Sequence, residues 1–281
     1  MKPLNQRIAS FYDESTPLWL DVWGDHMHHG YYGADGSQKK SHYEAQLDLM
    51  DELIDFARLD EAKPKRMLDA GCGVGGASRY LAGRLGASVT GLTLSPVQAA
   101  EGNRRAKNEG CDHLVSIRAE DMMSFSDEEG FDVIWSLESA EHLADKKGLL
   151  EHFYSLLKPG GTLAMITWCH RETPPQLSDK EQALLKDVCR LYHLPPWCSI
   201  GHYAETAEQV GFDEIKSADW SAAVAPFWAA VIKSALTWKG AVGLIKAGPQ
   251  TLKGAYAMRY MQRGFRQNLI RFGVFRMVKP K

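Results

Sequence analysis

The chain has 281 residues, 44% of them hydrophobic, and a formal net charge of −2 at pH 7. This length and apolar content suit one large α/β domain or one domain with a cap, and no run approaches the roughly 18 apolar residues that a membrane-spanning helix needs. The five cysteines form no C-x-x-C pair, which argues against a disulfide framework or a zinc site and fits a reducing compartment.

Charge is distributed unevenly along the chain. No Asp or Glu follows Asp219, whereas residues 220–281 carry eleven Lys or Arg; the first 219 residues hold the other 22 basic residues and all 35 acidic ones. A basic last fifth on an acidic body predicts an anionic partner, either membrane lipid or nucleic acid, unless these charges only face solvent. The first residues lack the apolar run of a secretory signal peptide, so we do not expect secretion.

Residues 1–45 precede the first expected strand and are dense in aromatic and polar groups. Three histidines occur within residues 26–29, but no His or Cys partner lies at a usual ligand spacing nearby, so the sequence predicts no metal site. We expect the segment to cover a ligand as a lid. A helix is predicted over 41–59 because its apolar residues fall on one stripe, namely Leu47, Met50, Leu53, Ile54 and Ala57.

The rest of the chain is organised around the stretch from Met67 to Gly76. A short apolar run reaches Asp69, a glycine-rich turn follows, and residues 77–85 have helical spacing. Strand, tight turn and helix in this order are typical of a nucleotide-binding βαβ unit. An acid beside the turn repels phosphate but accepts from an ammonium group, which favours S-adenosylmethionine over NAD. The contacts expected in this turn are Asp69, Gly71, Cys72, Gly73, Gly75 and Gly76.

Two more strands are predicted at 87–92 and 114–118, separated by a helix that starts at Pro96. Thr93 stands where related folds place an acid for the ribose hydroxyls, and its hydroxyl can make only one of those bonds. After the third strand, an acid can accept from the adenine amino group while a methionine packs on the ring. The ligand-binding residues expected here are Thr93, Leu94, Gln98, Glu120, Asp121 and Met122.

The fourth strand, residues 131–136, is followed by titratable side chains at the sheet edge where ligands bind in open α/β folds. We expect His142 to act as a general base, oriented by Glu138 or Glu141. The alternative is that the histidine only caps or packs against the next helix. Ser136, at the end of the strand, joins the expected ligand-binding residues.

Helices and strands continue to alternate to the end of the chain. The helices are expected at 149–157, 181–192, 203–210 and 220–264, and the strands at 162–167, 212–218 and 269–278. We divide the chain into an N-terminal lid and helix (1–60), a core that binds S-adenosylmethionine (61–170), and the remaining strands with a helical substrate cap (171–281). These parts are expected to form one catalytic unit.

Several motifs resemble those of class I S-adenosylmethionine-dependent methyltransferases: the glycine turn, G-L-T-L-S-P at 91–96 and K-P-G-G at 158–161. More specific blocks, spread over nearly the whole chain, resemble the γ-tocopherol methyltransferase family. They are FYDES at 11–15, WGDHMHHG at 23–30, WSLESAEH at 135–142, LPPWC at 194–198 and VAPFW at 224–228. Thr93 departs from the broad class but is similar to this subfamily. The subfamily also includes plant enzymes that N-methylate indole alkaloids, so the acceptor stays open.

The resemblance implies an α/β fold: a Rossmann-like seven-stranded sheet with an antiparallel last strand, helices on both faces and a helical cap. It also implies a methyltransferase that O-methylates, or methylates the ring of, a lipophilic tocopherol-like chromanol or quinol. An N-methyltransferase of an alkaloid-type amine is the alternative, and a protein that binds S-adenosylmethionine without turnover is a third. An RNA methyltransferase is disfavoured because a tryptophan-rich apolar cap suits a greasy small ligand, so no nucleic-acid partner is expected.

The lid and the cap are expected to supply the acceptor-binding residues, which are Trp23, His29, Tyr31, His170, Trp197, Phe227 and Trp228. Aromatic faces among them can shield the cation of the methyl donor. The expected location is the cytoplasm or the plastid stroma, with peripheral contact to an anionic membrane through the basic end. The sequence leaves the oligomeric state open.

Overall fold

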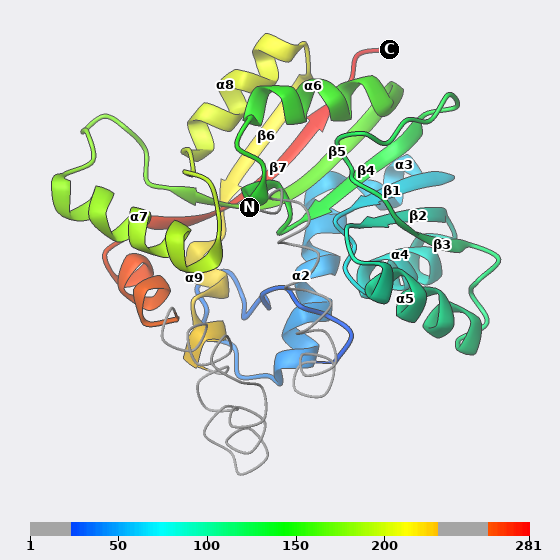
Figure 1. The fold of residues 1–281 in the computed structure, drawn as a ribbon, viewed down its shortest axis with the longest axis horizontal. Helices are drawn as coiled ribbons and strands as arrows, with labels where there is room; N and C mark the ends of the chain where they lie inside the picture. The colour runs from blue at the N-terminus through cyan, green and yellow to red at the C-terminus, as the bar shows by residue number, and fades with distance from the viewer. Residues whose placement is uncertain (1–23, 230–257) are drawn as a thin grey trace.

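The computed structural model describes residues 24–229 and 258–281. Within these ranges, seven strands form one sheet in the order β3-β2-β1-β4-β5-β7-β6 (Figure 1). The strands are β1 (Arg66–Ala70), β2 (Ser88–Thr93), β3 (Val115–Ala119), β4 (Phe131–Leu137), β5 (Leu157–His170), β6 (Asp213–Asp219) and β7 (Ile270–Val278).

The pairing of the strands confirms the predicted mixed sheet. Strands β1 to β5 run parallel to one another, whereas β7 is antiparallel to both β5 and β6. Strand order reverses at β1, which pairs with β2 on one side and β4 on the other. In open α/β sheets, ligands bind outside the carboxyl ends of the strands at such a switch point.

Helices cover both faces of the sheet (Figure 1). They are α2 (His42–Ala57), α3 (Leu59–Ala62), α4 (Gly76–Leu85), α5 (Pro96–Asn108), the 3-10 turn η1 (Ala140–His142), α6 (Lys146–Leu156), α7 (Asp179–Tyr192), α8 (Ile200–Val210) and α9 (Ser221–Val224). Leu49 of α2 and Leu81 of α4 belong to one buried apolar cluster, while Phe153 of α6 and Tyr203 of α8 belong to a second. The two clusters pack on opposite faces, as predicted.

Several helices begin where the sequence supplies an N-terminal cap. Ser41 and Glu44 form a capping box at the start of α2, with Glu44 N donating to Ser41 Oγ at 3.2 Å. Ser95 Oγ accepts from Gln98 N at 3.0 Å, and Pro96 occupies the first position of α5. These caps fix the direction in which each helix leaves the sheet.

Several boundaries differ from the prediction, most clearly those of β5, of α8 and of the stretch 220–264. Strand β5 is longer than 162–167 because the K-P-G-G turn is absorbed into it, with a register shift against β4. Helix α8 starts before residue 203 because Ser199 Oγ accepts from His202 N at 3.1 Å. The helix predicted at 220–264 is interrupted at Ala225, with α9 before it and helical residues 226–229 after it. Residues 258–266 are also helical, and residues 230–257 lie outside the described residues.

Candidate functional site

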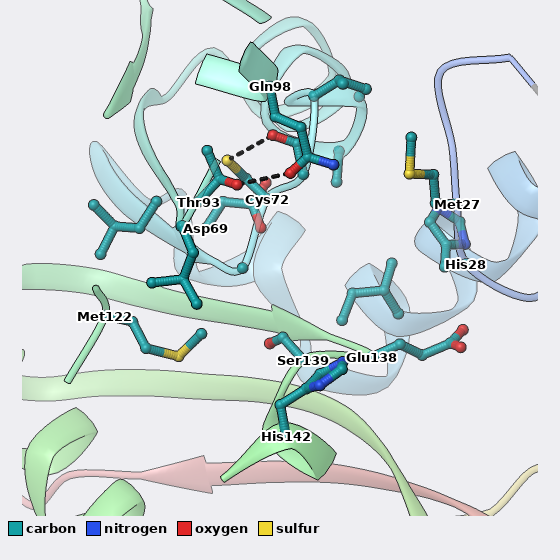
Figure 2. A pocket seen from close by; sticks show the side chains of 18 of the residues that line it. Met27, His28, Asp69, Cys72, Thr93, Gln98, Met122, Glu138, Ser139 and His142 are labelled. Carbon is teal, nitrogen blue, oxygen red and sulfur yellow. Dashed lines mark hydrogen bonds between the residues drawn. The ribbon is translucent and has the colours of Figure 1, made fainter. Parts of the chain in front are cut away.

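A cavity of about 330 Å³ lies at the carboxyl ends of β1, β2 and β4, at the switch point of the sheet (Figure 2). Most of the predicted ligand-binding residues line it: Asp69, Gly71, Cys72, Gly73, Gly76, Thr93, Leu94, Gln98, Glu120, Asp121 and Met122. The lining also contains residues that were not predicted from the sequence, namely Asp25, His26, Met27, His28, Val74, Ala77, Leu92, Met123, Leu137, Ser139 and Leu143.

The glycine turn after β1 forms one wall of this cavity. Gly71 and Cys72 both donate their backbone N–H groups to the carbonyl oxygen of Leu92, at 3.0 and 2.8 Å. Gly71 has a φ of +90° and Gly73 a φ of +55°, conformations that L side chains rarely adopt. A Cβ at Gly73 would meet no protein atom within 4 Å. The turn therefore lets a ligand approach the backbone closely.

Asp69 is buried beside this turn, where Ser78 Oγ donates to its Oδ2 at 2.6 Å. Burial raises the pKa of Asp69 to about 7, against the opposing effect of the Ser78 hydrogen bonds. A cationic ligand group would stabilise the ionised form of this carboxyl. The buried carboxylate of Asp69 therefore fits the ammonium end of S-adenosylmethionine.

Neutral groups occupy the place where an acid usually binds ribose hydroxyls. Thr93 Oγ1 donates to Gln98 Oε1 at 2.7 Å and accepts from Ser95 N at 3.2 Å. Further along the same wall, Asp121 and Met122 line the cavity, and Met122 stands on the left of the view in Figure 2. Assignment of this part of the cavity to the adenosyl group stays a prediction.

Glu138 lies at the end of β4 in a strained backbone conformation, with a φ of +52°. Its Oε1 accepts from the backbone N–H of His29 at 2.7 Å, and its Oε2 lies 2.7 Å from the His29 Nδ1. Burial acts to raise the pKa of Glu138, but His29 outweighs it and leaves the pKa below its ordinary value. The carboxylate is therefore ionised and anchors a segment 109 residues away in the sequence.

The neighbouring titratable groups have different charge states. Burial, followed by the charge of Glu138, raises the pKa of Glu141 to about 8, so this carboxyl is protonated at pH 7. Glu141 accepts from Thr167 Oγ1 at 3.0 Å and does not belong to the cavity lining. His142 does line the cavity, and burial lowers its pKa to about 4. Orientation of His142 by either glutamate stays a prediction.

Residues 25–28 line the cavity on the side of α4 and α5. Asp25 accepts from Arg79 at 2.9 Å and pairs with Arg105. The Gln46 side chain donates to the carbonyl oxygens of His26 and His28 at 2.7 and 3.0 Å. These contacts hold residues 25–28 in the lining. That the segment acts as a lid stays a prediction.

The predicted acceptor-binding residues mostly gather behind Glu138 rather than in the cavity lining. The His29 ring lies 3.8 Å from the Phe227 ring and 5.1 Å from the Trp228 ring, centroid to centroid. Trp168 lies 4.7 Å from His29 and stacks on Trp197 at 5.8 Å, so these side chains form one aromatic cluster. None of the four predicted members, His29, Trp197, Phe227 and Trp228, lines the cavity.

The other predicted residues have structural partners. Tyr31 packs on Trp220 at 5.3 Å, and His170 Nδ1 lies 2.7 Å from the carbonyl oxygen of Arg171. Gly75 is the N-cap of α4, and Ser136 Oγ lies 2.8 Å from Ser139 Oγ; Tyr31, His170, Gly75 and Ser136 are all absent from the lining. Trp23 lies outside the described residues.

Comparison with known proteins places these features in context. A family model described as "Methyltransferase domain" matches residues 68–165. Over 99% of its length, the chain is 43% identical to a probable chloroplastic tocopherol O-methyltransferase of Oryza sativa subsp. japonica, of which it covers 79%. It is 30% identical to norajmaline N-methyltransferase of Rauvolfia serpentina, with all of both chains covered.

The fold is also found among solved structures. Geranyl diphosphate C-methyltransferase from Streptomyces coelicolor A3(2), in complex with Mg2+, geranyl diphosphate and S-adenosyl-L-homocysteine, has a TM-score of 0.77 and is 21% identical. The match covers 99% of this chain and 98% of that one. At this identity, the likeness supports the fold alone.

Proposed function

The chain belongs to the tocopherol methyltransferase family of S-adenosylmethionine-dependent methyltransferases, and we propose that it methylates a tocopherol-like chromanol or quinol. The observation that carries the proposal is the meeting of Asp69 and the glycine turn with Glu138 and His142 in one cavity. The first two suit the methyl donor. Glu138 and His142 bring titratable side chains to the same cavity.

S-adenosylmethionine, when bound, supplies a methyl group already activated on a sulfonium. The protein must hold the donor, exclude water and receive a proton from the acceptor. We assign the ammonium group to Asp69 and the ribose hydroxyls to Thr93 and Gln98. A phenol has a pKa near 10, so a base helps its hydroxyl lose the proton as the new bond forms. His142 lines the cavity and is neutral at pH 7, the protonation state that a base requires.

The direct test is incubation of the protein with labelled S-adenosylmethionine and a panel of tocopherols, quinols, alkaloid amines and RNA. We expect label on a chromanol or quinol and none on RNA. Label on an amine alone would favour the N-methyltransferase alternative, which the similarity to norajmaline N-methyltransferase supports. Binding of S-adenosylmethionine without any labelled product would favour a protein without turnover.

Donor affinity should depend on pH through Asp69, whose pKa is raised to about 7. Below pH 7 this carboxyl is protonated and must lose its proton before it can pair with an ammonium group. We expect the affinity for S-adenosylhomocysteine to fall roughly tenfold per pH unit below pH 7 and to level off above it. Calorimetric titration from pH 5.5 to 8.5 measures this. Asp69→Asn should bind more weakly at pH 8 and lose the slope; an equal slope in both proteins would contradict the assignment.

His142→Ala should lower turnover by roughly 10²-fold, as expected when a general base is removed. The affinity for S-adenosylhomocysteine should change little, because the proton acceptor is not assigned to donor binding. Single-turnover rates at saturating donor measure the first effect, and calorimetry measures the second. An unchanged rate would show that His142 is structural or that solvent takes the proton.

We also propose that the protein contacts anionic membranes peripherally. In the described ranges, no helix has both the length and the hydropathy needed to span a bilayer. Arg259, Arg263 and Arg266 are exposed, and their spacing of four and three places them on one face of helical residues 258–266. A chromanol with a lipid tail resides in the bilayer, so such a surface would shorten its path. A plastid location, as the rice relative's name states for that protein, belongs to the same proposal.

Co-sedimentation with vesicles tests this contact. Each basic residue near an anionic surface contributes about 1 kcal/mol, and salt weakens the attraction. We expect binding to anionic vesicles at low salt that is reduced at high salt, and little binding to neutral vesicles. Replacing Arg259, Arg263 and Arg266 by Gln together should weaken it. Equal recovery in the supernatant with neutral and anionic vesicles at low salt would contradict the proposal.

A further inference from the structure

Lys146 is a buried lysine beside the turn that carries His142, and the mechanism above gives it no role. It is the first residue of α6, and only 8% of its surface is exposed. Burial disfavours an ammonium group, and the N-terminal end of a helix repels a cation. Contacts within the fold must therefore compensate for the position of this side chain.

The ammonium group of Lys146 is bound by residues 140–143. Its Nζ donates to the carbonyl oxygen of Ala140 at 3.1 Å and also to the carbonyl oxygen of Leu143. These two carbonyl groups stand on either side of His142 in the sequence, and His142 lines the cavity (Figure 2). Lys146 itself is not in the lining, so it holds the turn without touching a ligand.

The turn has few backbone bonds of its own. The 3-10 turn η1 has three residues, and the bonds from His142 N to Ser139 O and from Leu143 N to Ala140 O are both 3.2 Å long. Hydrogen bonds from a charged donor are stronger than those between neutral groups. The two bonds from Lys146 therefore contribute much of what fixes the direction in which the His142 side chain leaves the backbone.

The charge of Lys146 also acts on His142. The titratable groups that face Lys146 are Glu141 of η1, Cys169 of β5, Cys189 of α7, Cys198, and Tyr203 of α8. All five are neutral at pH 7, because burial raises the pKa of each, that of Glu141 to about 8 and those of Cys189 and Cys198 to about 11.

None of these neutral groups offsets the ammonium charge. Burial lowers the pKa of Lys146, but the two carbonyl oxygens favour its protonated form. Burial, followed by the charge of Lys146, lowers the pKa of His142 to about 4. Lys146 thus contacts the turn mechanically and the His142 ring electrostatically.

We propose that Lys146 is a positioning residue for methyl transfer, in that its ammonium group holds residues 140–143 and so points the His142 ring at the methyl acceptor. The inference rests on the proposed function, because it assumes turnover with His142 as the base. Since Lys146 touches the turn but not the cavity, its effect on the reaction must pass through His142. Its removal should change turnover only while His142 is present.

A double-mutant cycle tests this dependence. Lys146→Met and Lys147→Met are each made in the wild-type protein and in His142→Ala. Methionine keeps the apolar stem of a buried lysine and removes both the hydrogen bonds and the charge. Lys147 is the matched control, because it is the next residue of α6 but is exposed and pairs with Glu151 at 3.6 Å. Single-turnover rates are measured with saturating labelled donor and a chromanol or quinol.

We expect Lys146→Met to lower the rate roughly 10- to 10²-fold in the presence of His142, because a misplaced base loses its alignment with the acceptor. In His142→Ala, the same substitution should change the residual rate less than about twofold. Lys147→Met should have little effect in either background, and the affinity for S-adenosylhomocysteine should stay the same. Equal losses from Lys146→Met in both backgrounds would overturn the inference, since Lys146 would then only support the fold.

The His142 ring provides a readout that a general loss of stability would not move. A positive charge opposes protonation of the ring, so Lys146→Met should raise the pKa of His142 above about 4, whereas Lys147→Met should not. NMR of protein with isotope-labelled histidine follows this titration, and the His142 signal is identified by its loss in His142→Ala. The same titration midpoint in the wild-type protein and in Lys146→Met would contradict the proposed contact.

The outcomes separate this inference from the function on which it rests. If Lys146→Met does not fold, Lys146→Gln takes its place in the same cycle, because its amide can still donate to the turn while the charge is lost. If the wild-type protein methylates a chromanol or quinol and the losses are equal in both backgrounds, only the inference fails. If the wild-type protein methylates neither, the proposed function fails and the role of Lys146 fails with it.

Discussion

Glu138→Gln is expected to lower turnover by roughly 10²–10³-fold, whereas Glu141→Gln, three residues further on, should change it less than about threefold. The two side chains have the same chemistry and are both buried, but they carry different charges at pH 7. Glu138 is ionised because His29 holds its pKa below the ordinary value. Glu141 is protonated, with a pKa of about 8, because burial and the charge of Glu138 both oppose ionisation.

The same substitution therefore removes a charge at one position and none at the other. At Glu138, a glutamine amide can accept from only one of the two His29 donors, and its N–H groups would face the second. The anchor of the N-terminal segment is then weakened, and the adjacent His28 loses its fixed place in the cavity. At Glu141, the glutamine oxygen can still accept from Thr167 as the protonated carboxyl does.

Initial rates at saturating donor and acceptor, measured at pH 7, provide the comparison. Circular dichroism and thermal melting of each variant show whether folding is retained. Equal losses of turnover in Glu138→Gln and Glu141→Gln would contradict the assigned charge states. A normal rate in Glu138→Gln would show that the bonds to His29 are not needed for turnover.

The sequence predicted the parts of this site that depend on local order in the chain. The run from Met67 to Gly76 encodes strand, turn and helix within ten residues, so Asp69 and its glycines could be placed at a ligand site without knowledge of the rest. The position of His142 at a sheet edge follows from the same reasoning, because it lies in the short segment that follows β4.

The rest of the site depends on contacts between distant segments. The bonds of His29 to Glu138 join residues 109 positions apart, and no spacing rule gives such a pair. The opposite charge states of Glu138 and Glu141 come from burial and from each other, which the sequence does not show. The density of histidines in residues 26–29 is the sequence signal for this part of the cavity, and it predicts a lid with His29 as an acceptor-binding residue, not His28 in the lining.

The aromatic residues illustrate a different limit of sequence reasoning. Phe227, Trp228 and Trp197 were expected to bind the acceptor, and they lie in one aromatic cluster with His29. Sequence cannot tell whether an aromatic side chain lines a cavity or packs behind its wall, because both positions are buried. In this structure they pack behind Glu138, where they exclude water from the hydrogen bonds between His29 and Glu138.

Gly71→Ala should lower the affinity for S-adenosylhomocysteine by roughly 10²-fold. The residue has a φ of +90°, and an added Cβ would lie 2.4 Å from Ser139 Cβ. Ser139 cannot easily move away, because its Oγ donates to the carbonyl oxygen of Ala70 at 2.6 Å and lies 2.8 Å from Ser136 Oγ. The turn after β1 and the turn after β4 are thus packed directly against each other.

Relief of this clash must come from displacement of the glycine turn, and the turn is a wall of the cavity. The left-handed backbone costs an alanine about 1–2 kcal/mol and overpacking adds about 1–3 kcal/mol, so the variant should also melt at a lower temperature. Gly86→Ala is the matched control. Its φ is +65°, an added Cβ would meet no atom within 4 Å, and it caps the far end of α4, away from the cavity.

The control should therefore lose stability from backbone strain while keeping the donor site intact. Calorimetric titration with S-adenosylhomocysteine and thermal melting separate the two effects. We expect both variants to melt earlier and only Gly71→Ala to bind more weakly. Wild-type affinity in Gly71→Ala would show that the turn can yield without disturbing the ligand, and would remove the glycine turn from the assigned donor site. Equal losses of affinity in both variants would instead trace the effect to general destabilisation of α4.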